Sequence, residues 1–275
     1  MKKNIDNKTV DGFGDEWERF DQSLLSDNEH TLMFQAYFSI FPWDLLQIDS
    51  EGFDLGCGSG RWAKLVAPKV GKLHCIDPSS AIEIARKNLE NHSNCIIHKC
   101  DIDSMKIRDG SMDFGYSLGV LHHIPDTQLA LNSCVKKLKP GAPFLLYLYY
   151  SFDNRPFWFR YIWRLSNILR IGISRLPFKL RYLVSQIIAI FAYYPMARIS
   201  KFLEALKVNV SNIPLSSYRH NSFYTMRTDA LDRFGTRLEQ RFSKKEIHKM
   251  MNTAGLININ FSNQTPYWCA VGIRK

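Results

Sequence analysis

The second half of the chain is poor in acidic residues. Residues 151–275 contain 6 of the 26 Asp and Glu in the 275-residue sequence, against 20 Lys and Arg, whereas residues 1–150 contain 20 acidic and 16 basic residues. The net charge of +10 therefore comes from the C-terminal part of the chain. An excess of positive charge favours an acidic substrate or an anionic surface as its partner.

Paired cysteines and an apolar N-terminal segment are also absent. No Cys-x-x-Cys motif occurs, and the cysteines lie mostly in apolar, strand-like runs, at positions 57, 75, 95, 100, 134 and 269. This argues against a disulfide framework or a metal site, so we expect reduced, buried thiols, no metal and a cytoplasmic protein. The first residues, Met-Lys-Lys-Asn-Ile-Asp-Asn, contain no apolar core, so we expect no secretory signal.

No uninterrupted apolar run has the length of a membrane span. Residues 182–194 form a run of 13 without a charge, which ends at Pro195 and is flanked by Arg181 and Arg198. A span needs about 18 to 20 residues, so the sequence predicts a buried or interfacial helix and no anchor. For residues 156–200 two interpretations stay open. They form a lid on the core, or they form a surface that touches a lipid-linked substrate or a membrane, in which case the protein would be peripheral at the inner face of that membrane.

A glycine-rich turn follows a short apolar strand at residues 53–55. Gly56, Gly58 and Gly60 permit positive φ and close approach of a ligand, and the helix that follows offers unpaired N–H groups. Strand, turn and helix together form the first unit of a doubly wound α/β sheet. A dinucleotide-binding turn needs a third glycine at position 61, where this chain has Arg61, and this argues against an NAD-type oxidoreductase.

Three further motifs follow the turn at the ends of predicted strands. Asp77 stands 21 positions after Gly56, close to the spacing of about 20 expected for an acid that accepts ribose hydroxyls. Asp101 and Ile102 follow a third strand at residues 95–99, and a fourth strand runs into the loop Leu-His-His-Ile-Pro-Asp at residues 121–126. For each acid, an ordinary turn residue is the alternative.

In this order, with Lys-Pro-Gly at residues 139–141, the motifs resemble those of the class I S-adenosylmethionine-dependent methyltransferases. The resemblance implies a three-layer, Rossmann-like α/β fold with a seven-stranded sheet whose last two strands are antiparallel, and S-adenosylmethionine as cofactor. It also implies that the methionine part lies on the glycine turn and the adenine at Asp101 and Ile102. The implied cofactor-binding residues are Asp54, Gly56, Gly58, Gly60, Asp77, Asp101, Ile102, Leu118 and Trp17.

The same resemblance divides the chain into four segments. Residues 1–48 form an N-terminal helical lid or anchor, in which Trp17 and Phe20 either fold over the cofactor site or fix an amphipathic helix to the core. Residues 49–150 form the cofactor-binding core. Residues 151–242 form a helical insertion between strands five and six that caps the substrate, and residues 243–275 contribute a helix, started by a capping box at Ser243 and Glu246, and the last strands.

The loop at residues 121–126 is similar to that of members that methylate small molecules. The Asn/Asp-Pro-Pro-Tyr sequence typical of base-methylating enzymes is absent, so we expect a small acceptor and no nucleic acid. Arginine forks match carboxylates and phosphates, which favours an anionic or amphiphilic acceptor, such as a sugar derivative or lipid-linked precursor, although a solvated basic face is the alternative. Candidate substrate-binding residues are Tyr147, Arg219, His220, Arg237 and Arg241.

The predicted reaction is in-line displacement of the sulfonium methyl group by a nucleophile on the acceptor. Positioning of the two reactants supplies much of the catalysis. His122 or His123 is the candidate general base where the acceptor must lose a proton, and otherwise they orient the loop. An RNA or protein methyltransferase and a non-catalytic cofactor-binding module remain as alternatives, and the sequence gives no oligomeric state.

Overall fold

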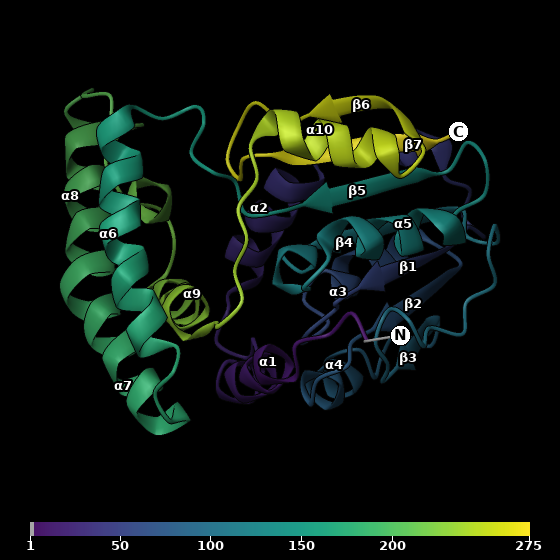
Figure 1. The fold of residues 1–275 in the computed structure, drawn as a ribbon, viewed down its shortest axis with the longest axis horizontal. Helices are drawn as coiled ribbons and strands as arrows, with labels where there is room; N and C mark the ends of the chain where they lie inside the picture. The colour runs from purple at the N-terminus through teal and green to yellow at the C-terminus, as the bar shows by residue number, and fades with distance from the viewer. Residues whose placement is uncertain (1–2) are drawn as a thin grey trace. The chain divides into compact units, whose positions relative to one another are not determined.

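The computed structural model describes residues 3–275, which fold into two compact units (Figure 1). The core unit comprises Met1–Gln22, Thr31–Tyr150 and Leu238–Lys275. The helical unit comprises Ser23–His30 and Ser151–Arg237. The chain thus leaves the core unit twice, briefly for Ser23–His30 and then for Ser151–Arg237, so that the helical unit is inserted into the sequence of the core.

A single seven-stranded sheet forms the centre of the core unit, in the order β3-β2-β1-β4-β5-β7-β6. The first five strands pair in parallel, whereas β7 runs antiparallel to both β5 and β6. The predicted three-layer α/β fold and its antiparallel last strands are confirmed. The strands are β1 (Glu51–Leu55), β2 (Lys72–Ile76), β3 (Cys95–His98), β4 (Phe114–Leu118), β5 (Pro143–Tyr147), β6 (Leu256–Phe261) and β7 (Cys269–Arg274).

Helices cover both faces of this sheet. One apolar cluster joins Phe53 and Phe144 of the sheet to α5 (Thr127–Lys137) and α10 (Lys244–Thr253), and a second joins Phe114 and Tyr116 to helices α2, α3 and α4. Because both faces are covered, the central strands are nearly continuous apolar runs. The remaining helices of the core unit are α1 (Asn7–Arg19), α2 (Asp27–Phe38, whose first residues belong to the helical unit), α3 (Ala63–Val66), α4 (Ala81–Asn88) and the short 3-10 helices η1 (Trp43–Leu45), η2 (Ala67–Lys69) and η3 (Leu121–His123).

Two local predictions are confirmed by the side chains. The Ser243 hydroxyl accepts the Glu246 N–H, and the Glu246 carboxylate accepts the Ser243 N–H, which is the predicted capping box at the start of α10. All six cysteines are free, and burial is as predicted for Cys57, Cys75, Cys134 and Cys269, whereas Cys95 and Cys100 are half-buried. Burial raises the pKa of the Cys57 thiol to about 11, so this thiol is inert at neutral pH.

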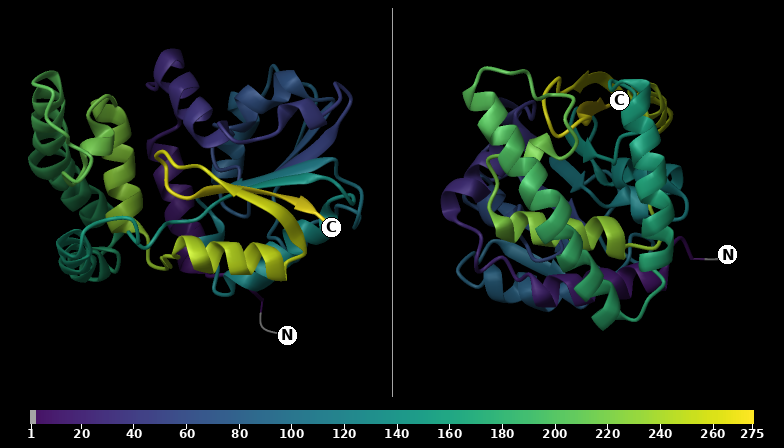
Figure 2. Two further views of the ribbon diagram at one scale, coloured as in Figure 1. Left: turned by 90° about the horizontal axis from the view of Figure 1, so that it is seen from above. Right: turned by 90° about the vertical axis from the view of Figure 1, so that its left-hand side faces the viewer.

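The helical unit packs its helices around α9 (Phe223–Gly235). Both α6 (Phe157–Ile173) and α7 (Phe178–Ile188) contact α9, and α7 continues through the π-helical segment η4 (Ala189–Tyr193) into α8 (Tyr194–Ala205). Small side chains such as Ala189 and Ala197 allow Met226 and Phe234 of α9 to pack closely against this long helix. The 3-10 helix η5 (Ser216–Tyr218) precedes α9, and Figure 2 shows the helices from two further sides.

The helix that contains the apolar run is longer than the run itself. The helix does not stop at Pro195 but continues for 28 residues, Phe178–Ala205, which by length and composition could cross a membrane, although a third of its most apolar window (33%) is buried. Proline ends most helices because it lacks an N–H and clashes with the preceding turn. Here the Tyr194 N–H bonds to the Ala189 carbonyl, five residues back, and this π-helical turn accommodates the ring.

Candidate functional site

The glycine turn lies at the carboxyl end of β1, in the middle of the parallel part of the sheet. Gly56, Gly58 and Gly60 have φ values of +76°, +52° and +77°, which residues with side chains rarely adopt. A Cβ added at Gly56 would lie 2.3 Å from a Val120 methyl group, so the turn also needs glycine for space. The structure therefore has the tight, side-chain-free turn that the sequence predicts, with its backbone available for close approach.

Asp77, at the carboxyl end of β2, fixes this turn. One carboxylate oxygen, Oδ2, accepts the Gly58 N–H at 2.9 Å, and Oδ1 accepts the N–H and hydroxyl of Ser79 at 2.8 and 2.6 Å. Burial raises the pKa of Asp77, and the hydrogen bonds from Ser79 and Gly58 oppose the shift. An ionised carboxylate offers about four acceptor positions, so Asp77 retains capacity for a hydroxyl donor such as a ribose.

Asp54 precedes the turn and is fully buried. Burial raises the pKa of the carboxyl well above its ordinary value, and the neighbouring Tyr116 hydroxyl opposes the shift. Neither Asp54 Oδ2 nor the Tyr116 hydroxyl has a hydrogen bond of good geometry among residues 3–275. The Ser59 hydroxyl, inside the turn, is likewise buried without a partner in the described part of the chain. Polar atoms left unsatisfied at one turn are costly unless a polar ligand satisfies them. The donor set fits a molecule with an ammonium group, which would pair with the Asp54 carboxylate.

Trp17, on α1, lies against the same turn. A Cβ at Gly58 would be 3.0 Å from the indole Nε1, and the Arg61 guanidinium lies 5.6 Å from the indole ring and 4.3 Å from the ring of Trp62. Phe20 is buried at the end of α1. The helix is thus anchored by Phe20 and places Trp17 at the turn, and closure of Trp17 over a cofactor stays a prediction.

The predicted adenine residues follow β3. The Asp101 carboxylate accepts hydrogen bonds from the N–H and hydroxyl of Ser104 and pairs with Lys3, with 3.4 Å between Lys3 Nζ and Asp101 Oδ2. Burial alone would raise the pKa of Asp101, but the contacts with Ser104 and Lys3 lower it below its ordinary value, so the carboxylate stays ionised. Ile102 and Leu118, which ends β4, are both buried in the apolar clusters of the sheet. Their predicted contacts with a cofactor remain untested.

The two histidines of the loop after β4 lie in direct contact. The His122 ring lies 3.9 Å from the His123 ring and 3.9 Å from the ring of Tyr149, onto which it stacks. Burial, together with the charges of His123 and Arg241, lowers the pKa of His122 well below its ordinary value, so the imidazole is neutral at physiological pH.

The hydrogen bonds of the two rings assign them different tautomers. His122 Nδ1 accepts the Tyr149 N–H at 3.4 Å, so its hydrogen is on Nε2, which is buried with no hydrogen-bond partner among residues 3–275. His123 Nδ1 donates to the Leu238 carbonyl at 2.6 Å, which leaves the lone pair of a neutral ring on Nε2. Of the two predicted candidates, His123 therefore has the form of a base and His122 that of a hydrogen-bond donor.

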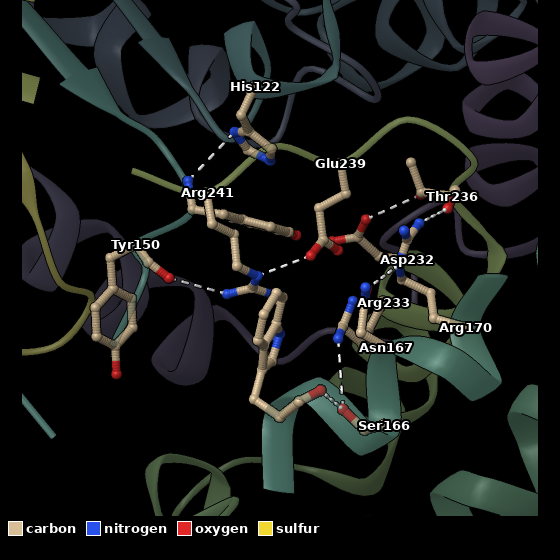
Figure 3. Close-up of polar contacts among 12 residues, drawn as sticks. His122, Tyr150, Ser166, Asn167, Arg170, Asp232, Arg233, Thr236, Glu239 and Arg241 are labelled. Carbon is tan, nitrogen blue, oxygen red and sulfur yellow. Dashed lines mark hydrogen bonds and ion pairs between the residues drawn. The ribbon is translucent and has the colours of Figure 1, made fainter. Parts of the chain in front are cut away.

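Arg241 lies beside this pair and is held from three sides. Its Nε donates to Glu239 at 2.7 Å and one terminal nitrogen to the Tyr150 carbonyl at 3.2 Å, as Figure 3 shows, and its guanidinium stacks 5.0 Å from the centre of the Tyr149 ring. Tyr147, another predicted substrate residue, ends β5, with its ring 6.0 Å from that of Tyr149. The structure thus brings Arg241 and Tyr147 together with the histidine loop.

The other predicted substrate residues belong to the helical unit. Arg219 and His220 both bind Glu204 of α8, with nitrogen to oxygen distances of 2.8 and 2.7 Å. The carbonyl of Arg237 accepts a hydrogen bond from Arg170, whose guanidinium also binds Asn167 and Thr236 (Figure 3). In the structure Arg219 and His220 serve the packing of their own unit, and a role in substrate binding stays a prediction for all three.

Sequence reasoning missed three residues of this region. Glu239 balances Arg241, Tyr149 stacks on His122, and the Gln240 N–H bonds to the His122 carbonyl at 3.1 Å. Residues 238–241 thereby run along the histidine loop although more than 110 positions separate them in sequence. The one signal in the sequence was the aromatic end of β5, Tyr147-Leu-Tyr149-Tyr150, at the sheet edge where ligands bind.

Comparison with known proteins assigns the central part of the chain. Residues 53–146 match the family model described as "Methyltransferase domain", so this segment, which carries the glycine turn and the histidine loop, is a methyltransferase domain. The chain is 35% identical over 100 residues to phosphoethanolamine N-methyltransferase 2 from Caenorhabditis elegans, and 31% identical over 99 residues to "Probable tRNA methyltransferase 9B" from Bos taurus.

These matches are partial in both directions. Each covers 35% of this chain, and the chain spans 23% and 20% of the two relatives. Among solved structures, a methyltransferase from Haloferax volcanii, in complex with the Trm112 methyltransferase activator, aligns over 96% of this chain and 97% of its own with a TM-score of 0.53 and 16% identity. At that identity the likeness shows the fold alone.

Proposed function

We propose that this chain, whose residues 53–146 form a methyltransferase domain, transfers a methyl group from S-adenosylmethionine to a small anionic or amphiphilic acceptor. The observation that carries the proposal is the glycine turn at the end of β1, with positive φ at Gly56, Gly58 and Gly60 and the Gly58 N–H held by Asp77. A cationic, amino-acid-like ligand would satisfy the buried carboxylate that precedes the turn. We place the reaction in the cytoplasm.

The chain's own residues would hold the cofactor along the ends of the first three strands. Asp54 and the turn would bind the methionine part, Asp77 the ribose hydroxyls, and Asp101 and Ile102 the adenine. Bound there, S-adenosylmethionine supplies an electrophilic methyl group. The protein contributes alignment with the acceptor, which for well-oriented reactants lowers the barrier by up to about 7 to 11 kcal/mol.

The histidine loop supports a proton-transfer step where the acceptor has an acidic hydrogen. His123 Nε2, as the lone-pair nitrogen, would take the proton, and its Nδ1 hydrogen bond to Leu238 would stabilise the charge that forms. His122 Nε2–H would donate a hydrogen bond to the acceptor. The nearby Arg241 favours an anionic group on the acceptor, because a guanidinium binds carboxylates and phosphates in a fork.

Calorimetry with S-adenosylmethionine tests the cofactor site. We expect Asp77→Ala to weaken binding by about 1.5 to 3 kcal/mol, as for loss of hydrogen bonds to a charged group. Asp44→Ala, which removes an exposed acid of η1, serves as the control and should bind as the wild type does. Equal binding by the wild type and Asp77→Ala would refute the assignment of the site.

A nucleic acid acceptor is the second candidate, since the C-terminal half of the chain is basic and one relative is named as a tRNA methyltransferase. The two acceptors differ in their response to salt, because each neutralised phosphate releases counterions. Incubation with labelled S-adenosylmethionine and a cell lysate, separated into small-molecule, lipid and RNA fractions, identifies the acceptor. If the label appears in RNA, and if the binding constant for RNA falls with several powers of the salt concentration, the small-molecule proposal is wrong.

A further inference from the structure

The helical unit exposes far more apolar surface than the core unit. Of the 26 exposed large apolar side chains among residues 3–275, 19 lie within residues 157–208. Soluble monomers rarely expose large continuous apolar patches, and those that do mostly use them as interaction sites. Scattered exposed apolar residues need no explanation, so the arrangement of these 19 decides whether they form a surface.

On α6 the exposed side chains form a stripe. Phe157, Tyr161, Leu165 and Ile168 follow one another at intervals of four, four and three residues, which places them on one side of the helix. The opposite side carries the buried Arg170, which is tied to the end of α9 through the carbonyl of Thr236. The stripe therefore lies on the side of α6 that does not pack on α9.

The long helix Phe178–Ala205 has the same division. Leu183, Ile187, Ile190 and Tyr194, at intervals of four, three and four residues, are exposed. The inner side of this helix, which packs on α9, carries both apolar and polar side chains. The hydrogen bonds between its polar side chains and α9 are described below. We call the exposed stripes of α6 and of this helix the apolar face.

Positive charge dominates the border of the apolar face. Residues 154–203 contain nine Lys and Arg and no Asp or Glu, and Arg160, Arg164, Lys179 and Lys201 among them are exposed. Over the whole insertion, residues 151–237 hold 14 Lys and Arg against 4 Asp and Glu, which leaves 22 of each sign in the rest of the chain. The net charge of +10 thus resides entirely in this segment.

We infer that the apolar face docks on the surface of an anionic membrane, with α6 and the helix Phe178–Ala205 lying in the plane of the lipid headgroups. Aromatic and aliphatic side chains would enter the boundary of the acyl chains, and the bordering Arg and Lys would bind lipid phosphates. Neither contact depends on the cofactor, so the inference stands apart from the proposed methyl transfer.

Charge argues against a second copy of the chain as the occupant. In a two-fold dimer the same patch meets itself, and this patch offers basic side chains with no acidic ones among residues 154–203 to pair with them. Like charges placed together disfavour association. A lipid surface with exposed phosphates is complementary where a second copy is not.

The inner side of the long helix argues against a membrane span. Arg181 donates to the Gly235 carbonyl at 3.2 Å, and Arg227 of α9 donates to Gln186 at 2.6 Å and to the Tyr182 hydroxyl at 2.9 Å. A helix drawn away from α9 into hydrocarbon would leave these groups unsatisfied, at a cost of several kcal/mol for each. The helix therefore offers a membrane only its outer side.

Vesicle sedimentation with the full chain tests the inference. Vesicles of phosphatidylcholine alone are compared with an equimolar mixture of phosphatidylcholine and phosphatidylglycerol, at low and high salt. We expect binding to the anionic vesicles that is at least about tenfold stronger than to the neutral ones and that weakens with salt. Extraction at alkaline pH should release the protein, as for a peripheral contact.

Two variants with a matched control separate the contributions. Phe157→Asp/Phe191→Asp places charges at two apolar positions that are 78% and 76% exposed, and should abolish binding without loss of folding, as circular dichroism would verify. Ile48→Asp, equally exposed at 79% but in the core unit, should bind as the wild type does. Arg160→Gln/Arg164→Gln should weaken binding about tenfold.

Three outcomes would overturn the inference. The first is absence of binding to anionic vesicles. The second is a dimer in light scattering that Phe157→Asp/Phe191→Asp dissociates, since the face would then join two copies. The third is membrane association that resists alkaline extraction, which would show a span.

Discussion

The two units of this chain use apolar residues in opposite ways. In the core unit Phe53, Phe114 and Phe144 are completely buried between sheet and helices, whereas in the helical unit Phe157, Phe191 and Phe202 are exposed. The core unit carries 22 Lys and Arg against 20 Asp and Glu, whereas the helical unit carries 14 against 6. A fold needs apolar residues inside for stability. Apolar residues that lie outside, bordered by one sign of charge, are better explained by a partner.

Truncation of one phenylalanine in each unit gives the largest expected difference. Phe53→Ala removes a fully buried ring from the sheet and should cost about 3 to 5 kcal/mol of unfolding free energy. Phe191→Ala removes a ring that is 76% exposed and should change the unfolding free energy by no more than about 0.5 kcal/mol. Urea denaturation of both variants measures the difference. Equal losses would mean that the apolar face is covered in solution.

The second prediction concerns the two neighbouring histidines of the core unit, for which we propose a role in proton transfer. We expect His123→Asn to lower kcat about 100-fold where the acceptor loses a proton, since general bases contribute about that factor. Asparagine can still donate to the Leu238 carbonyl, so the loop should keep its shape. His122→Asn can still accept the Tyr149 N–H and should lower kcat less.

Turnover of labelled S-adenosylmethionine and its pH profile provide the measurement. Loss in His123→Asn of the fall in kcat at low pH, which protonation of a general base causes, with unchanged donor affinity, separates a base from a structural residue. A larger effect for His122→Asn would reverse the assignment of the two rings.

The third prediction is a gain of stability at the proposed site. Burial holds the folded-state pKa of Asp54 above its unfolded value, so ionisation destabilises the fold, and this cost grows as pH rises from the unfolded pKa through the folded one. Asp54→Asn should therefore raise the unfolding free energy at pH 7 by about 1 kcal/mol and weaken donor binding. Thermal melts with and without S-adenosylmethionine test both parts. A destabilised variant that binds normally would contradict the role of Asp54.

The smallest effect is expected at Glu51, on the rim of the sheet. A hydrogen bond from His74 at 2.7 Å is the main cause that lowers the pKa of Glu51, with Lys72 contributing. A depressed carboxyl pKa gives stability that is present above the unfolded value and is lost as pH falls through the folded one. Because Glu51 is partly exposed, Glu51→Gln should cost about 0.5 kcal/mol at pH 7 and nothing near pH 3. Urea midpoints at the two pH values measure it.

The parts of the structure that could be predicted are those with local causes. The positive φ of Gly56, Gly58 and Gly60, the strand that ends in Asp77, and the capping box of Ser243 and Glu246 each depend on a few neighbouring residues. The seven-stranded sheet and its antiparallel last strands followed from the resemblance to a known family, which supplies contacts between distant segments.

What could not be predicted depends on distant or compensating contacts. The length of the helix through Pro195 could not be predicted, because it depends on the π-helical bond from the Tyr194 N–H to the Ala189 carbonyl, which accommodates the proline ring. Glu239 and Arg241 gained their place from packing against residues 121–126 and 149–150, far along the chain. The basic residues Arg219 and His220 suggested a substrate site, yet both side chains form ion pairs with Glu204. The sequence does not show which of the many basic residues lies near this acidic one.

The Asp77 carboxylate holds the Gly58 N–H and Ser79 by contacts that lie entirely within the chain. A binding loop that is fixed in advance loses little further conformational entropy when it is occupied. If Asp77 is also the acceptor for the ribose, the same side chain both preorganises the receptor and reads the ligand. Substitution of Asp77 would then slow association as well as hasten dissociation, because a loosened turn adopts its receptive shape only part of the time.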